Sequence, residues 1–158
     1  MEQPMRLTQF ADYSLRLLML LAEQPERRVT IAEASGAYGI SRHHLMKVAL
    51  HLAKAGFIRP SRGRNGGLVL ARLAKDIRIG DVLRATEPDF ALVGCMRGEP
   101  CTIVERCRLP KVLAAAIQAF LDASDRYVLA DLVVPQTDMV LEMTEVPLRL
   151  NSASSCDA

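Results

Sequence analysis

The sequence predicts a mostly α-helical fold in which a winged helix-turn-helix domain is followed by a long C-terminal dimerisation helix. Half of the 158 residues are hydrophobic, no Trp is present and only 4% are aromatic, which favours packed helices over a β-sandwich. Apolar residues recur at helical spacing in several segments. One of these segments is followed by two strand-like runs that flank RGRNGG, a pattern typical of a hairpin.

Four regions are predicted along the chain. Residues 5–88 form the winged helix-turn-helix domain, 89–108 a loop that contains cysteines, 109–134 the long helix and 135–158 a flexible tail. The tail contains Cys156, which we interpret as a bystander thiol. The N-terminus shows no apolar targeting segment, and apolar runs such as LLMLLA are far too short to span a membrane, so we expect a cytoplasmic protein.

The first three helices are predicted from their capping residues. Thr8 is a candidate N-cap for the first helix. Thr30 and Glu33 form a T-x-x-E capping box at the start of a short second helix. Gly39 ends that helix, and Ser41 caps a third, RHHLMKVALHLAKA. A short helix, a tight turn and a helix with a basic first turn make up the helix-turn-helix arrangement, whose second helix enters the major groove of DNA.

The runs FIRPS and GLVLA are predicted to form the wing, and the glycines of RGRNGG allow the chain to turn between them. Residues 41–78 hold nine basic residues and one acid, although the net charge of the whole chain is only +2. Such a local excess is typical of a phosphate-binding surface, whereas an ordinary solvated face and a hairpin with a solvated tip are the alternatives. The residues predicted to contact double-stranded operator DNA are Ser41, Arg42, His43, His44, Lys47, Arg62, Arg64 and Asn65.

Three cysteines, Cys95, Cys101 and Cys107, stand at equal intervals in the predicted loop as C-x5-C-x5-C. Clustered thiolates in an intracellular protein are more often metal ligands than disulfides. The spacing is not that of structural zinc, which usually shows closely spaced cysteine pairs. An iron–sulfur cluster normally needs a fourth protein ligand, which has to come from elsewhere. A structural zinc, a thiol redox switch and three unligated cysteines remain alternatives.

Beyond the wing, IRIGDVLRATEP predicts a fourth helix that ends before Pro88. Helical periodicity returns from Leu109, where Val112, Ile117 and Phe120 belong to an apolar stripe. We expect this stripe to pack against a second subunit, because a two-fold homodimer places two recognition helices on a palindromic site. The sequence shows no Cys–His or Ser–His–Asp constellation, so an enzyme with a reactive cysteine is the weaker alternative.

From Met5 to about Pro135, the chain resembles the IscR/NsrR family of cytosolic winged-helix iron–sulfur regulators. The likeness rests on MRLTQFADYSLR, on GISRHHLMKVALHLAKAGFI followed by RGRNGGLVLA, on IRIGDVLRATEP and on C-x5-C-x5-C. The cysteine arrangement after a winged helix is the most specific of these features. The likeness is greater to the nitric-oxide-sensing members, because IscR-like members carry a histidine ligand where this chain has Pro110.

The resemblance implies that Cys95, Cys101 and Cys107 ligate an iron–sulfur cluster, [4Fe–4S] or alternatively [2Fe–2S], with Asp12 of the other subunit as the fourth ligand. It also implies a repressor that senses nitric oxide and controls nitric-oxide-detoxification genes. Without the resemblance, Asp12 is interpreted as a first-turn acid that the helix dipole favours. The alternative function is a regulator of the same family that senses redox or iron–sulfur status, or one with a zinc or thiol site.

Overall fold

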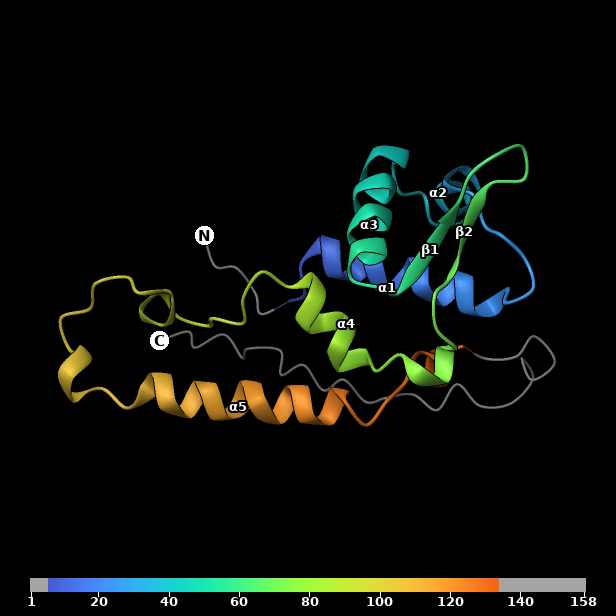
Figure 1. Ribbon diagram of the computed structural model, residues 1–158. Coiled ribbons are helices and arrows are strands. Elements are labelled where there is room, and N and C mark those ends of the chain that lie inside the picture. The colour runs from blue at the N-terminus through green and yellow to red at the C-terminus, as the bar shows by residue number, and fades with distance from the viewer. Residues whose placement is uncertain (1–5, 134–158) are drawn as a thin grey trace, which may run out of the picture.

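The computed structural model describes residues 6–133, so the predicted tail at 135–158, with Cys156, lies outside the described residues. Figure 1 shows a mostly helical chain with one small antiparallel sheet, as the sequence predicts. In chain order, the helices and strands are α1 (Gln9–Glu23), α2 (Ile31–Tyr38), α3 (Arg42–Lys54), β1 (Ile58–Ser61), β2 (Gly67–Leu70), α4 (Ile79–Thr86) and α5 (Leu109–Ser124). Among residues 6–133, no helix combines the length and apolar character that crossing a bilayer requires.

The predicted caps of the first three helices are confirmed. The Thr8 hydroxyl accepts a hydrogen bond from the backbone N–H of residue 11 at 3.1 Å at the start of α1. Thr30 and Glu33 form the complete capping box of α2. Gly39, with φ +65°, ends α2, and the Ser41 hydroxyl accepts from the third residue of α3 at 3.3 Å. The left-handed glycine therefore sets the tight turn that aims α3 away from α2.

The hydrophobic core joins α1, α3, the strands and the start of α4. Its fully buried members include Leu17 and Leu21 of α1, Leu45 and Leu52 of α3 and Val82 of α4. Burial of each leucine contributes about 2 kcal/mol relative to an exposed position. This core fixes α3 on α1 and leaves the opposite side of α3 open to solvent.

The sheet is a hairpin in which β1 and β2 pair antiparallel, from Ile58 opposite Leu70 to Ser61 opposite Gly67. The predicted wing is therefore present. The α1–α2 linker adds an antiparallel bridge beside β2, between Val29 and Leu68. The hairpin is thus paired on one side by a segment nearly forty residues earlier in the chain.

The predicted cysteine loop at 89–108 contains two short 3₁₀ helices, Gly94–Arg97 and Val104–Arg106. Figure 1 shows this loop at the end of the molecule away from β1 and β2, with α5 returning beneath α4. The return is secured by backbone hydrogen bonds of 3.0 Å from the Ile79 N–H to the Tyr127 carbonyl and of 2.8 Å from the Leu129 N–H to the Ile77 carbonyl.

The long helix predicted over 109–134 ends earlier in the structure, at Ser124. Asp125, the next residue, accepts two hydrogen bonds from Arg84 of α4, at 2.8 and 2.7 Å. The guanidinium of Arg84 lowers the pKa of Asp125. Leu129 then enters the core fully buried, within a 3₁₀ helix at Leu129–Leu132. The chain turns after α5 because Leu129 is drawn into the core of the winged helix-turn-helix domain.

Candidate DNA interface and cysteine loop

The solvent side of α3 carries a mixed row of basic and apolar side chains. Arg42, His43 and Lys47 are exposed along it, as the sequence predicts for a recognition helix. Met46 and Leu50, each 60% exposed, lie in the same row. A recognition helix uses such a mixture, since cations contact phosphates or guanine and apolar groups contact the thymine methyl. The two apolar residues were not predicted, because their spacing resembles that of core positions.

Two other predicted DNA contacts on α3 have partners within the protein. The His44 ring lies beside that of Tyr13 on α1, with ring centroids 6.1 Å apart. Both rings line a hollow of about 270 Å³ between α1 and α3. The Ser41 hydroxyl is the N-cap of α3. His44 therefore contacts α1 and Ser41 caps α3. The His43 ring lies 6.3 Å from that of His44, and Lys47 lines the same hollow.

The tip of the wing presents two arginines to solvent. Arg62 and Arg64 are exposed on either side of Gly63, whose φ of +104° requires glycine. Neither arginine forms an ion pair with any residue between 6 and 133. Asn65 follows, and its backbone carbonyl accepts a hydrogen bond of 2.9 Å from Arg28 of the α1–α2 linker. Arg28 was not predicted, because its contact is 37 residues away in sequence.

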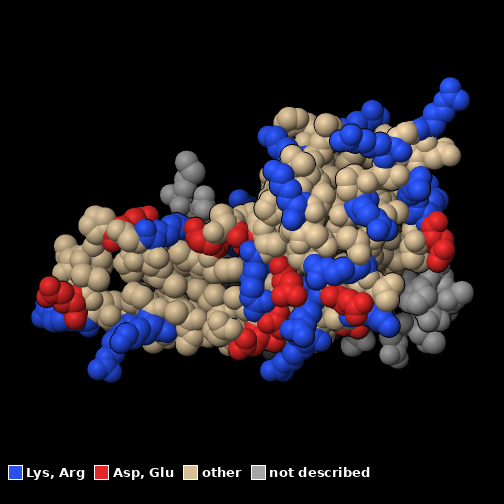
Figure 2. Space-filling view, in the orientation of Figure 1, with Lys and Arg blue, Asp and Glu red and all other residues tan. Residues whose placement is uncertain are grey.

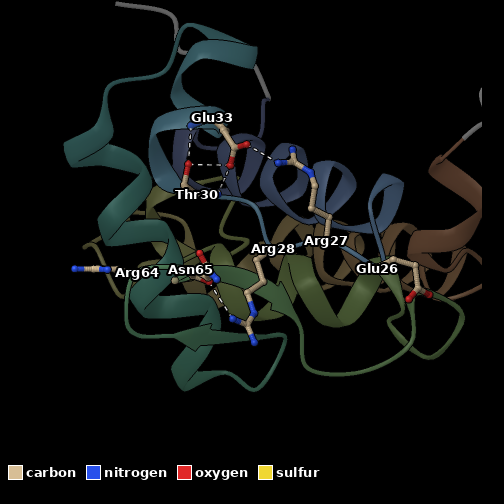
Figure 3. Close-up of a pocket in the computed structure, with 8 residues that line it drawn as sticks. Glu26, Arg27, Arg28, Thr30, Glu33, Arg64 and Asn65 are labelled. Carbon is tan, nitrogen blue, oxygen red and sulfur yellow. Dashed lines mark hydrogen bonds and ion pairs between the residues drawn. The ribbon is translucent and has the colours of Figure 1, made fainter.

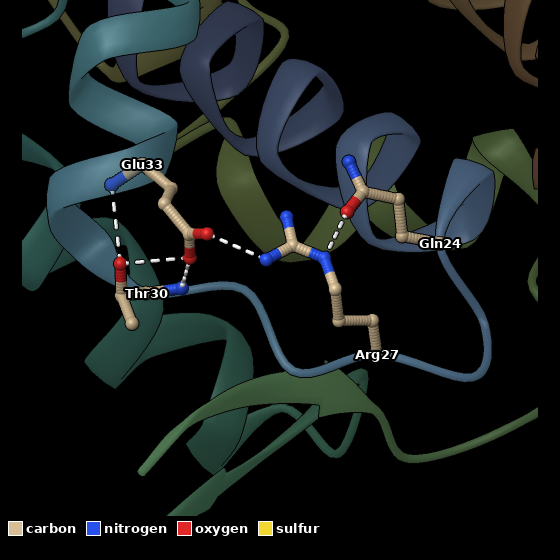
Figure 4. A network of polar contacts seen from close by, with 4 residues as sticks. All are labelled: Gln24, Arg27, Thr30 and Glu33. Atoms are coloured by element: carbon tan, nitrogen blue, oxygen red, sulfur yellow. Dashed lines mark hydrogen bonds and ion pairs between the residues drawn. The ribbon is translucent and has the colours of Figure 1, made fainter. Parts of the chain in front are cut away.

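The same linker carries a polar network that holds it to α2 (Figure 4). Arg27 donates to Gln24 and to Glu33, both at 2.6 Å. The Glu33 carboxylate also accepts from the Thr30 backbone N–H at 2.7 Å and from the Thr30 hydroxyl at 2.9 Å. The backbone hydrogen bond from Thr30 and then the bond from Arg27 lower the pKa of Glu33 to about 2.

An open hollow of about 540 Å³ lies between this linker and the wing. Figure 3 shows Arg28 reaching toward Asn65, with Arg64 extended away from both. Three arginines and two glutamates border the hollow. One of these arginines, Arg27, is already paired with Glu33, so the hollow offers fewer free cations than its lining suggests.

The part of the surface over α3 and the hairpin carries basic side chains without acidic ones. In the view of Figure 2, this upper part shows Lys and Arg among other residues and no Asp or Glu, whereas both signs are mixed below and at the far end. This distribution matches the excess of basic residues predicted from positions 41–78. A surface of one sign attracts the phosphates of DNA and steers the protein to it.

The three predicted cysteine ligands lie on the loop between α4 and α5. Each thiol is free and partly exposed. Cys95 lies within the first 3₁₀ helix of the loop, and Cys107 directly follows the second. Within residues 6–133, no group of three or more Cys, His, Asp or Glu side chains is gathered around one point. The loop therefore supplies three soft donors on one segment of the chain.

Asp12, the predicted fourth ligand, lies in the first turn of α1. Its carboxylate accepts a 2.9 Å hydrogen bond from Arg16 one turn later, and both side chains are about half exposed. The Asp12 carboxylate raises the pKa of Arg16. Within one subunit, Asp12 therefore has the surface ion pair expected of a first-turn acid, and an exposed pair of this kind is easily exchanged for another partner.

Two polar contacts connect the stem of the cysteine loop to the DNA-binding helices. Glu87, which follows α4, accepts hydrogen bonds from the Thr8 backbone N–H at 2.8 Å and from its hydroxyl at 3.2 Å. His51 of α3 bonds through Nε2 to the Ala85 carbonyl, and its ring packs edge-on against Phe10. The C-terminal end of α4 therefore contacts both the start of α1 and helix α3.

Several solved structures have a similar fold. CymR, the global cysteine regulator of B. subtilis, superposes with a TM-score of 0.62 at 24% identity, over 82% of this chain and 96% of that one. Staphylococcus aureus CymR in its oxidized form gives 0.64 at 24% identity, over 81% and 95%. T. potens IscR gives 0.62 at 24% identity, over 81% and 85%. At these identities the likeness concerns the fold.

The family is established by the sequence as a whole. The sequence model of Rrf2, described as an iron-dependent transcriptional regulator, matches residues 7–135 of the 158. Members of this family are DNA-binding regulators and not enzymes, in agreement with the basic surface over α3 and the wing. The chain therefore belongs to the Rrf2 family of transcriptional regulators.

Proposed function

We propose that the protein is a homodimeric, iron–sulfur-dependent repressor that binds operator DNA through α3 and the wing and responds to nitric oxide. The observation that carries the proposal is the set of three equally spaced, partly exposed thiols on the loop that follows α4. The end of α4 contacts both α1 and α3, so a change at the loop has a physical route to the recognition helix. The iron dependence in the description of the family supports the same assignment.

The donor set fits an iron–sulfur cluster. Cys95, Cys101 and Cys107 supply three soft thiolates, and Asp12 of a second subunit would complete the site. A bound cluster would supply iron atoms with which nitric oxide reacts. The response to nitric oxide rests on the resemblance to the nitric-oxide-sensing members and on Pro110, which occupies the position of the IscR-type histidine.

The homodimer is supported by the exposed apolar side of α5. Leu109, Val112 and Phe120 are 48%, 63% and 48% exposed, and Leu121 alone is buried within this helix. Three exposed apolar side chains on one helix favour a partner, and the Rrf2 regulators act on DNA. A second copy of α5 would bury them and bring two α3 helices to one operator.

Loss of any one cysteine ligand tests the proposal directly. We expect Cys95→Ser, Cys101→Ser and Cys107→Ser each to lower the iron and sulfide content of anaerobically purified protein to near zero and to remove its visible absorption. Cys156→Ser is the matched control and keeps both, because Cys156 is predicted to be a bystander. Operator affinity, measured by fluorescence anisotropy, falls with the iron content.

The second candidate is a regulator that senses the oxidation state of these thiols without iron. It is favoured by the free, partly exposed state of all three cysteines. A colourless protein whose operator affinity changes on thiol oxidation, with no iron or sulfide bound, would replace the first proposal with this one. One zinc ion bound per cysteine loop, with no iron, would instead identify the loop as a structural zinc site.

A further inference from the structure

The α1–α2 linker lies against the wing through backbone contacts. The Val29 N–H donates to the Leu68 carbonyl at 3.1 Å, and the Leu68 N–H donates to the Val29 carbonyl at 2.8 Å. Strand β2 comes unusually close at Gly67, where a Cβ atom would lie 3.0 Å from the Arg28 Cβ and 3.1 Å from the Val29 oxygen. Glycine is what allows this approach. The linker therefore supports the base of the hairpin.

The tip of the hairpin is held separately, by a side chain. Arg28 Nη1 donates to the Asn65 carbonyl at 2.9 Å, directly beside Arg64 (Figure 3). A two-stranded hairpin is marginally stable by itself, and here the chain turns at Gly63 with a positive φ. The guanidinium is a planar group with several donors in fixed directions, so it restricts the carbonyl more than a flexible amine would.

The two neighbouring arginines of the linker have different partners. Arg27 is neutralised by Glu33 and bonds to Gln24, which ties it to the helices (Figure 4). Arg28 has no acidic partner between residues 6 and 133, and its hydrogen bond goes to the wing. The chain thus provides a matched pair of exposed arginines, of which one contacts the wing and the other does not.

We infer that Arg28 is a positioning residue for DNA binding: it holds the wing through the Asn65 carbonyl and thereby fixes where Arg64 is presented to the DNA backbone. The inference rests on the proposed contact between the wing and DNA. It adds a residue outside both the recognition helix and the hairpin to those that determine operator affinity. Arg28 acts through Arg64, so its contribution depends on Arg64 being present.

A double-mutant cycle on the full-length protein tests this dependence. Operator affinity is measured over roughly 50 to 200 mM salt for wild type, Arg28→Ala, Arg64→Ala and the double variant, on a duplex obtained by selection from a randomised library. We expect Arg64→Ala to lower the salt slope, the dependence of log affinity on log salt concentration, by about one counterion. The loss of affinity that raising the salt over this range causes then becomes about threefold smaller. Arg28→Ala lowers the slope by a similar amount, and the double variant matches Arg64→Ala.

Arg27→Ala is the control, and its effect on affinity adds to that of Arg64→Ala. If the slopes of Arg28→Ala and Arg64→Ala also add, so that the double variant loses about two counterions, then Arg28 contacts phosphate itself and the inference is overturned. Equal coupling of Arg27 and Arg28 to Arg64 would overturn it as well, because a general loosening of the linker would then be the cause.

Hydrogen exchange of the DNA-free protein separates the inference from the proposed function. Arg28→Ala is expected to speed exchange of the Gly66 amide, which is bonded to the Gly63 carbonyl at the tip of the wing, while Arg27→Ala leaves it unchanged. If Arg64→Ala does not alter the salt slope, the proposed contact between the wing and DNA is wrong. The exchange measurement alone then tests whether Arg28 holds the wing. Unchanged exchange in Arg28→Ala would refute the inference.

Discussion

Glu33 shows how one carboxylate organises the helix-turn-helix. It closes the capping box of α2 and receives Arg27 from the linker, so that a helix start and a linker share one charged group. The Thr30 N–H satisfies one lone pair and the guanidinium of Arg27 another. These hydrogen bonds, first that from the Thr30 backbone and then that from Arg27, favour the ionised carboxylate and lower the pKa of Glu33 to about 2.

The lowered pKa of Glu33 predicts a pH-dependent contribution to stability. The carboxylate is more acidic in the folded chain than its ordinary value of 4.5, so its contribution is complete above that pH and is lost as the pH falls toward 2. We expect Glu33→Gln to lower the melting temperature at pH 7 and to differ progressively less from wild type below about pH 4.5. Circular dichroism at several pH values measures this difference.

Glu26→Gln is the control for that measurement. Glu26 borders the same hollow as Glu33 and accepts no hydrogen bond from the described part of the chain. Its substitution is expected to leave the melting temperature unchanged at every pH. A Glu33→Gln effect of the same size at pH 7 and at pH 3 would show that the side-chain shape, and not its charge, stabilises the start of α2.

Among the elements, α5 differs most from an ordinary amphipathic helix. Most of its residues are exposed, and Leu121 is the single residue of the helix that is buried. The helix that it contacts most is α4. Apolar side chains on a helix without a covering layer in its own chain are typical of a subunit interface. The turn at Ser124 limits the length of any interface that α5 forms by itself to 16 residues.

A charge on the exposed side of α5 is expected to dissociate the proposed dimer. Val112→Glu places an unpaired carboxylate in the interface of each subunit, which costs several kcal/mol, and about 3 kcal/mol already weakens association about a hundredfold. Light scattering should then give the mass of one chain at micromolar concentration. Gln118→Glu adds the same charge on the polar side of the helix, where Gln118 is exposed and bonded to Asp122, and should leave the dimer intact. A dimeric Val112→Glu variant would exclude α5 as the interface.

At the scale of the whole molecule, the sequence predicted the contacts that are local. The caps at Thr8, Thr30 and Ser41 were predicted correctly, because each cap and its partner lie within three residues. Contacts such as Arg28 with Asn65, or the Thr8 hydroxyl with a carboxylate 79 residues later, were not predictable, because they depend on how the elements pack. The end of α5 was placed too late for the same reason.

For the cysteine loop too, one part could be predicted from the sequence and another could not. The equal spacing of Cys95, Cys101 and Cys107 and their setting on an irregular segment could be predicted from the sequence. The positions of the thiols in space could not, because they depend on how the loop packs: within residues 6–133 no three Cys, His, Asp or Glu side chains are gathered around one point. The role of Asp12 stays a prediction, and its observed partner is Arg16.

The contact between Glu87 and Thr8 predicts that a change in the cysteine loop alters the position of α1. Glu87→Ala removes two hydrogen bonds at the start of α1, which is expected to cost about 1 kcal/mol and a few degrees of melting temperature. It should also narrow the ratio of operator affinities between iron-loaded and iron-free protein, because α1 is released from the loop stem. Asp89→Ala, which loses a surface ion pair with Arg97, is the control. An unaltered ratio of operator affinities would show that this contact does not couple the cysteine loop to DNA binding.

The backbone pairing of residues 77–79 with 127–129 has a consequence for how such a regulator diversifies. The segment that follows α4, with the cysteine loop and α5, leaves the DNA-binding domain and is brought back to it by this pairing. Insertions, deletions or new ligands inside that segment leave the pairing itself in place. One DNA-binding domain can therefore accept different chemical inputs without redesign of its own core.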